Sequence, residues 1–304
     1  MNLRVVLVAV LGLLSACQSS VSEVPAWQAP AQRDHAQLGV IEDLRTGQRL
    51  TPEMLLARLA SAPQVVVGEK HDNPDHHALQ LWLLRGLARE RSQGSLLLEM
   101  LNPDQQGAVD AVQQRLRQGE RLENLPRQLG WQQGWAWSLY GPLVSYALSQ
   151  PYPLLAANLD RDEIMAIYRS KPVLNGEAST AASVQQALLD DIRESHCGLL
   201  PETQLPAMLA VQQQRDRRMA ERLLAAPAPA LLLAGGFHVR KDLGIPLHMK
   251  DLAGIEPVVL ILVEAGQTIS AEQADYAWYT AALPEQDYSS SRAAATSRCA
   301  QMRR

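Results

Sequence analysis

Glu69, His71 and His77 lie close together in the segment VVVGEKHDNPDHHALQ, residues 65–80. A carboxylate two residues before an imidazole can bind a metal ion, accept a proton, or orient the imidazole through a hydrogen bond. His71 precedes an expected helix N-terminus, where the helix dipole disfavours an imidazolium, so we expect a neutral ring there. His76 falls on the apolar face of that helix and is expected to pack, whereas His77 can face solvent or a crevice.

Similar side chains follow three further apolar runs of the chain. Glu99 ends SLLLEM, and Asn158 and Asp160 end YPLLAANLD. His238 follows ALLLAGG and one phenylalanine. Ligands of open α/β sheets bind outside the carboxyl ends of the strands. We therefore expect these four strand ends to point carboxylate, amide and imidazole groups into one crevice.

Tyrosines form a second set of chemical candidates. Tyr140 lies in GWQQGWAWSLYGPLVSY, residues 130–146, directly before Gly141-Pro142, which could begin a helix. A helix N-terminus favours a phenolate, and tyrosinate is an established axial ligand of haem iron. Tyr276 and Tyr279 occur in a similar aromatic cluster, DYAWYT, after the last apolar run. The residues alone leave open which tyrosine is a ligand and which rings only fill the core.

The elements that position these residues follow from the pattern of apolar runs. Five runs of four to seven apolar residues, bounded by turn residues, are typical of strands buried on both faces. Helical periodicity lies between them, and Asn-Pro-Asp at 73–75 and 102–104 predicts two helix starts. The chain is therefore predicted to be α/β, with a mostly parallel central sheet, helices on both faces and an added helical lid region at about 177–225.

Both ends of the chain have a different character. Residues 1–16 combine a basic start with a short apolar run and are predicted to be a lipoprotein signal peptide, because Leu14-Ser15-Ala16-Cys17 is similar to a bacterial lipobox. Cleavage there would leave a lipid on Cys17 and a polar tether at 17–37, and Gln18 after the cysteine favours the outer membrane. Residues 286–304 are predicted to be a disordered tail.

Composition narrows the classes of partner and cofactor. The net charge of −4 gives no reason to expect nucleic acid as a partner. Cys197 and Cys299 remain after processing and could pair in an oxidising compartment, but two cysteines form no scaffold. Neither lies in a CxxC or CxxCH pattern, which excludes covalent c-type haem attachment and a four-cysteine zinc site.

Six blocks of the sequence resemble, in order, the ChaN-like haem-binding uptake lipoproteins, over about residues 38–283. These blocks are VVVGEKHDNPDHHALQLWLL, LLLEMLNPDQQ, LGWQQGWAWSLYGPLVSYA, PLLAANLDRDEI, LLLAGGFHVRKDLGIP and DYAWYT. The resemblance implies one haem-binding domain at 38–285, with a fold related to the Tiki, TraB and erythromycin-esterase group. One departure is Phe237, which is bulkier than the small or polar residue usual before the later histidine.

The same resemblance implies a function: an outer-membrane-anchored lipoprotein that binds ferric haem through a tyrosine, assists haem or iron uptake or storage, and joins two haems face to face across a homodimer. Tyr140 is the first candidate for the iron ligand, with Tyr276 and Tyr279 after it. The resemblance places five further residues in the crevice: Glu69, His71, His77, Glu99 and His238. Candidate cations for the propionates are Lys70, Arg161, Arg240 and Lys241.

The alternative function is a metal-dependent hydrolase of the protease or esterase type. Glu69, His71 and His238 would hold a divalent metal, and Glu99 would activate the water bound to it. This reading has no support from a nucleophile motif, because GxSxG does not occur in the sequence.

Overall fold

The core of the protein is a mixed sheet, seen here in a computed structural model that describes residues 23–196 and 198–284. Its strands within this range run in the order β2-β1-β8-β7-β3-β6-β4-β5, all parallel between β8 and β5, with β1 antiparallel to both of its neighbours. The strands are β1 (Ile41–Asp43), β2 (Gln48–Leu50), β3 (Gln64–Glu69), β4 (Ser95–Leu98), β5 (Leu154–Ala156), β6 (Ala230–Gly235), β7 (Val258–Glu264) and β8 (Tyr276–Thr280).

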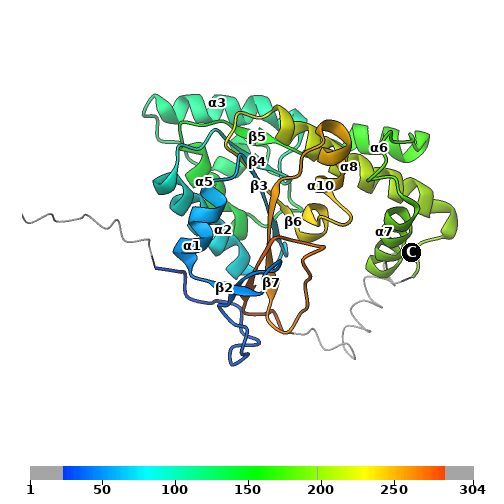
Figure 1. The fold of residues 1–304 in the computed structure, drawn as a ribbon. Coiled ribbons are helices and arrows are strands. Elements are labelled where there is room, and N and C mark those ends of the chain that lie inside the picture. Colours follow the sequence, from blue (N-terminus) through cyan, green and yellow to red (C-terminus); the bar gives the residue numbers. More distant parts are fainter. Residues whose placement is uncertain (1–22, 197, 285–304) are drawn as a thin grey trace, which may run out of the picture.

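Helices cover both faces of the sheet (Figure 1). One face carries α1 (Pro52–Ala60), α2 (Pro74–Glu90), α3 (Gln106–Arg117), the short α4 (Leu125–Gln128) and α5 (Trp137–Leu148). The other side carries α6 (Arg161–Ser170), α7 (Ala182–Ser195), α8 (Leu205–Ala225), the short α9 (Gly236–Val239) and α10 (Ile245–Ala253). Two 3₁₀ turns, η1 (Pro103–Gln105) and η2 (Glu202–Gln204), complete the described elements. The predicted fold class is confirmed.

The central strands alternate between two apolar cores, as strands buried on both faces must. In β3, Val65 and Val67 pack into the core under α1, α2 and α5, and Val66 packs into the core under α8 and α10. In β4, Leu96 and Leu98 face the first core and Leu97 faces the second. This alternation fixes the register of β3 and β4, and with it the positions of Glu69 and Glu99 at the ends of these strands.

The turn after β3 ends in a capped helix, as its Asn-Pro-Asp pattern predicts. The Asn73 side chain accepts a hydrogen bond from the Asp75 N–H at 2.9 Å, and Pro74 occupies the first turn of α2. Asp75 in turn accepts the N–H groups of Gln28 and Ala29. The described part of the predicted tether, residues 23–37, therefore contacts the domain through the start of α2.

The aromatic segment DYAWYT differs from its prediction. We expected a cluster after the last strand, but residues 276–280 form strand β8, which pairs with β7 and β1. Its five residues are all buried, so the aromatic rings belong to the two cores. The hairpin β1–β2 was also not expected, because strands of three residues are too short to give a clear alternating pattern.

The predicted lid region contains α7 and α8, with η2 between them. α8 packs against α10 and α6, whereas α7 contacts α8 and lies at the outer end of this layer (Figure 1). No helix in residues 23–196 or 198–284 is long and apolar enough to cross a membrane. The predicted signal peptide, Cys17, Cys197, Cys299 and the predicted tail at 286–304 lie outside the described residues.

The Asp251 carboxylate holds residues 177–179, which precede α7, through hydrogen bonds. Asp251 accepts the N–H groups of Glu177, Ala178 and Ser179 at 2.8–3.0 Å, and the Ser179 hydroxyl at 2.6 Å. Burial acts to raise the pKa of Asp251, but the hydrogen bonds from Ser179 and its neighbours outweigh it and lower this pKa to about 2.

Asp251→Ala is therefore expected to lower the free energy of unfolding by roughly 1–2 kcal/mol at pH 7, since charged hydrogen bonds are lost at a partly exposed site. Because the folded pKa is depressed, this contribution is present above the ordinary value of 3.8 and disappears as the pH falls toward 2. Urea unfolding at pH 7 and at pH 2.5–3 tests this, with exposed Asp190→Asn as the control. If the difference in unfolding free energy between wild type and Asp251→Ala is as large in acid as at pH 7, the prediction is wrong.

Candidate functional site

Glu69 is the centre of the first half of the site. It ends β3, it is 3% exposed, and its Oε1 atom lies 2.6 Å from His71 Nδ1. The Tyr140 hydroxyl donates to the same oxygen at 2.8 Å and lies 3.2 Å from His71 Nδ1. Burial acts to lower the pKa of His71, but the hydrogen bond and the charge of Glu69 raise it. An anionic neighbour thus outweighs the helix N-terminus, and the neutral ring expected from the sequence is disfavoured.

His238 is the centre of the second half. Its Nδ1 lies 2.5 Å from Asp216 Oδ1, and its Nε2 lies 3.3 Å from Glu99 Oε1. Glu99 also accepts the Gly235 N–H at 2.7 Å. Burial acts to lower the pKa of His238, but the two carboxylates raise it strongly. Burial acts to raise the pKa of Glu99, and His238 overcomes this and lowers it. The trio is thus an imidazolium held between two buried carboxylates.

The adjacent histidines of α2 have different surroundings. His76 is buried, its Nδ1 accepts the Lys70 N–H and its Nε2 lies 2.9 Å from the Thr280 hydroxyl, as expected for a packing residue. Burial lowers the pKa of His76 well below its usual value. His77 faces the site: its Nε2 lies 3.0 Å from the His71 carbonyl oxygen, and its ring contacts Tyr140 edge-on at 4.3 Å between centroids.

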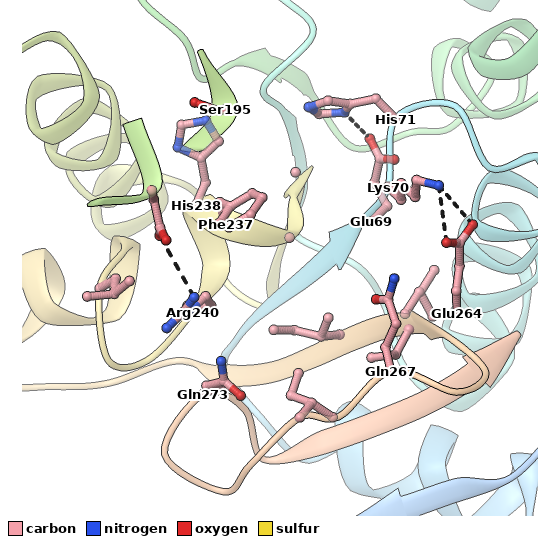
Figure 2. A pocket seen from close by; sticks show the side chains of 18 of the residues that line it. Glu69, Lys70, His71, Ser195, Phe237, His238, Arg240, Glu264, Gln267 and Gln273 are labelled. Carbon is pink, nitrogen blue, oxygen red and sulfur yellow. Dashed lines mark hydrogen bonds and ion pairs between the residues drawn. The ribbon is translucent and has the colours of Figure 1, made fainter. Parts of the chain in front are cut away.

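A pocket of about 550 Å³ opens beside these two clusters. Figure 2 shows Glu69 and His71 on one side of it and His238 and Phe237 on the other. The apolar parts of its wall come from α7, the loop before α10, β7 and the loop after β7: Leu188, Ile192, Leu243, Ile261, Val263 and Ile269. The size is typical of small-molecule sites of roughly 300–1,000 Å³, and polar side chains stand between the apolar parts of the wall.

Tyr140 lies directly behind this pocket. It is 1% exposed and does not line the cavity, but its hydroxyl contacts His71, whose side chain is 44% exposed and does. The helix begins at Trp137, so Tyr140 lies in its first turn and Pro142 lies inside it, not at its start. Burial and the charge of Glu69 raise the pKa of the phenol. These two effects outweigh the helix N-terminus that we expected to favour the phenolate.

The other tyrosines and the rest of the strand-end residues are placed differently. Tyr276 and Tyr279 are buried in β8 and line no part of the pocket. The Asn158 side chain donates a hydrogen bond to the Glu99 carbonyl oxygen at 3.0 Å and so stabilises the backbone directly after β4. Asp160 caps α6 by accepting the Glu163 N–H.

Most of the cations proposed for propionate binding already have carboxylate partners. Lys70 contacts Glu264 at 3.0 Å, and Lys241 contacts Asp275 at 2.9 Å. Arg240 lines the pocket but is held by Asp242 at 2.6 Å. Arg161 is exposed at the start of α6. Of these four cations, Lys70 and Arg240 line the pocket. To bind an anionic ligand, each would have to share its charge with its present carboxylate partner or give that partner up.

The metal-hydrolase arrangement does not assemble in the described part of the chain. There, no group of three His, Cys, Asp or Glu side chains is arranged to hold one metal ion. Both ring nitrogens of His238 face carboxylates, and Nδ1 of His71 is taken by Glu69. His238 is therefore an ion-pair partner here and not an open ligand.

Asp216 and Gln212 were not identified from the sequence, although both contact His238 from α8. Asp216 stands in the run QQQRDRRM, which resembles a solvated helix face. The signal that could have found it is its spacing from buried residues on the same face: Gln213, Met219, Ala220 and Leu223. An acid on a buried helix stripe requires a partner, and His238 is the partner.

The fold and the site define a class of protein. Residues 55–249 match the family model described as haem-binding uptake, Tiki superfamily, ChaN. The matched region exceeds half of the chain, and it contains Glu69, Glu99, Tyr140, Asp216 and His238. The chain belongs to this family of haem-binding uptake proteins, as its motifs indicated.

The structure is similar to the solved structure of ChaN from Campylobacter jejuni, which is described as showing cofacial haem binding. The two chains are 31% identical with a TM-score of 0.72, over 78% of this chain and 95% of ChaN. An erythromycin esterase, EreC, is 13% identical with a TM-score of 0.45, over 83% of this chain and 85% of the esterase. No curated protein matches the chain.

Proposed function

We propose that this protein is a lipid-anchored, haem-binding component of haem or iron uptake or storage, with ferric haem in the pocket beside Glu69 and Tyr140 as the iron ligand. The observation that carries the proposal is the triad of Tyr140, Glu69 and His71, which meets a pocket with several apolar walls through Glu69 and His71. The family supports haem as the ligand class.

The residues present fit the group. Ferric haem supplies an iron centre that takes an oxygen or nitrogen donor as axial ligand, and its ring requires apolar walls. Tyr140 is the buried oxygen donor that would hold the iron, and the Glu69 Oε1 atom, which accepts a hydrogen bond from this phenol, would take its proton. The other oxygen, Oε2, is buried without a hydrogen-bond partner among the described residues, so Glu69 has acceptor capacity to spare.

Access to Tyr140 requires a movement of His71. This ring lies between the phenol and the pocket, edge-on to Trp135 at 4.9 Å between centroids. His71 is itself half-exposed and could be the ligand instead, and the experiment below separates the two.

Hemin titration of the soluble protein beginning at Gln18 tests the ligand. The wild type is expected to bind saturably with a tyrosinate-type ferric spectrum, and Tyr140→Phe is expected to lose this spectrum and on the order of tenfold or more in affinity. Tyr276→Phe and Tyr279→Phe are the matched buried controls. Loss of the spectrum in a control, or in His71→Ala alone, would reassign the ligand. Absence of saturable hemin binding by the wild type would refute the proposal.

The anchor and the assembly are part of the same proposal. The lipobox around Cys17 supports acylation, and Gln18 supports delivery to the outer membrane. The relative described as binding haem cofacially supports a homodimer in which two haems stack. Palmitate labelling of the wild type and of Cys17→Ala, and sedimentation with and without hemin, test the lipid and the dimer separately.

A further inference from the structure

Phe237 is the chain's only phenylalanine, and 64% of it is exposed. It belongs to the short helix α9 and lines the pocket next to His238 (Figure 2). A large apolar ring left in water at the wall of a cavity has the most to gain from a ligand that covers it.

The backbone under Phe237 holds the ring at this position. A Cβ atom on Gly68 of β3 would lie 2.4 Å from Val239 Cγ2 and 3.1 Å from Gly236 Cα, so α9 packs directly on the strand. A Cβ atom on Gly244 would lie 2.0 Å from the His238 carbonyl oxygen, so the other side of α9 is equally tight. His238 is also fastened by Asp216. The ring therefore cannot withdraw into the core without moving the site.

The pocket beside Phe237 has several apolar walls. Leu188 and Ile192 of α7, together with Leu243, form one wall of the pocket, and Ile261 and Val263 of β7 form another. Polar groups line the pocket around Glu69 and His71 and also at Arg240, Gln267 and Gln273. This arrangement suits a ligand with a broad apolar face and polar groups at more than one edge, and a cavity of about 550 Å³ suits a small molecule better than a protein surface.

We infer that Phe237 contacts the ring of a bound porphyrin and contributes affinity that does not depend on iron. The inference rests on the proposed function and adds the residue that recognises the macrocycle as distinct from the metal. Aromatic rings gain from both apolar burial and offset or edge-on ring contacts, so the loss of Phe237 is expected to weaken porphyrin binding on the order of tenfold.

The test compares hemin with metal-free protoporphyrin IX, each titrated by tryptophan fluorescence quenching. Phe237→Ala is expected to weaken both ligands about tenfold, while Tyr140→Phe weakens hemin alone. Phe237→Tyr keeps the ring and is expected to retain wild-type affinity. Val173→Ala, at a residue 91% exposed that does not line the pocket, is the control for removing a surface apolar group. Phe237 is exposed, so its variants are expected to fold.

The outcomes are distinguishable. If the wild type binds hemin, and Phe237→Ala binds both porphyrins with the affinity of the wild type, the inference is wrong and the proposed function stands. If the wild type binds neither porphyrin, both are wrong. If Phe237→Ala leaves both affinities unchanged but dissociates a dimer in sedimentation, the ring covers a second copy of the chain and the inference is again overturned.

Discussion

His238→Gln is expected to lower the free energy of unfolding by roughly 3–5 kcal/mol, the range for removing one partner of a buried charge pair. Glu99 and Asp216, 1% and 0% exposed, would be left facing a neutral side chain. Urea unfolding at pH 7 measures the loss. Asp216→Asn in the His238→Gln background is the control, because it removes one of the uncompensated charges and is expected to recover part of the stability.

The pH dependence of this loss follows from the pKa of Glu99. His238 lowers this pKa below the ordinary 4.5, so the contribution of the pair is present above 4.5 and declines as the pH falls. The difference in unfolding free energy between wild type and His238→Gln is therefore expected to become smaller in acid, where the Glu99 carboxylate of the variant becomes protonated. A gap that stays constant between pH 7 and pH 3.5 would show that packing, and not charge, dominates.

Gly244→Ala is expected to destabilise the protein by about 1–3 kcal/mol and to weaken hemin binding at the same time. Its Cβ atom would lie 2.0 Å from the His238 carbonyl oxygen and 2.6 Å from the His238 carbonyl carbon, and backbone atoms cannot rotate away. The short helix α9, which carries His238, must shift, and with it the contacts of His238 to Glu99 and Asp216.

Gly107→Ala is the matched control for that variant. Gly107 is the second residue of α3, and its Cβ atom would meet nothing within 4 Å. Alanine at a helical site of this kind is expected to add about 0.5–1 kcal/mol of stability. Thermal unfolding and hemin titration of both variants check the pair. Wild-type hemin affinity in Gly244→Ala would show that the turn absorbs the methyl group without moving His238.

The long apolar runs made much of the fold predictable. The runs at 64–68, 95–100, 152–160, 230–236 and 257–264 all contain strands, because a strand buried on both faces leaves a continuous apolar signature. The start of α2 at Pro74 was predictable because the Asn-Pro-Asp pattern is a local helix-capping signal. The β1–β2 hairpin and β8 were missed since short or aromatic-rich strands resemble loops and clusters when their pairing partners are unknown.

The site was predictable in its strand-end residues and not in its helical ones. Glu69, Glu99 and His238 meet because they end neighbouring parallel strands, which topology alone requires. Asp216 reaches them from the middle of a helix, and only the packing of α8 on the sheet decides which side chains point inward. The pKa of Tyr140 likewise depends on Glu69, a contact that sequence spacing does not encode.

The sheet order has a consequence for the order of events during folding. β6 lies between β3 and β4, and its Leu231 pairs with Val65, which precedes it by more than half the chain. Until β6 pairs with both β3 and β4, these two strands have no strand between them, and Glu69 and Glu99 do not lie at the edge of one sheet. Contacts so distant in sequence form late and slowly. We therefore expect porphyrin binding only after the sheet is complete. The time at which binding appears during refolding would then report when β6 enters the sheet.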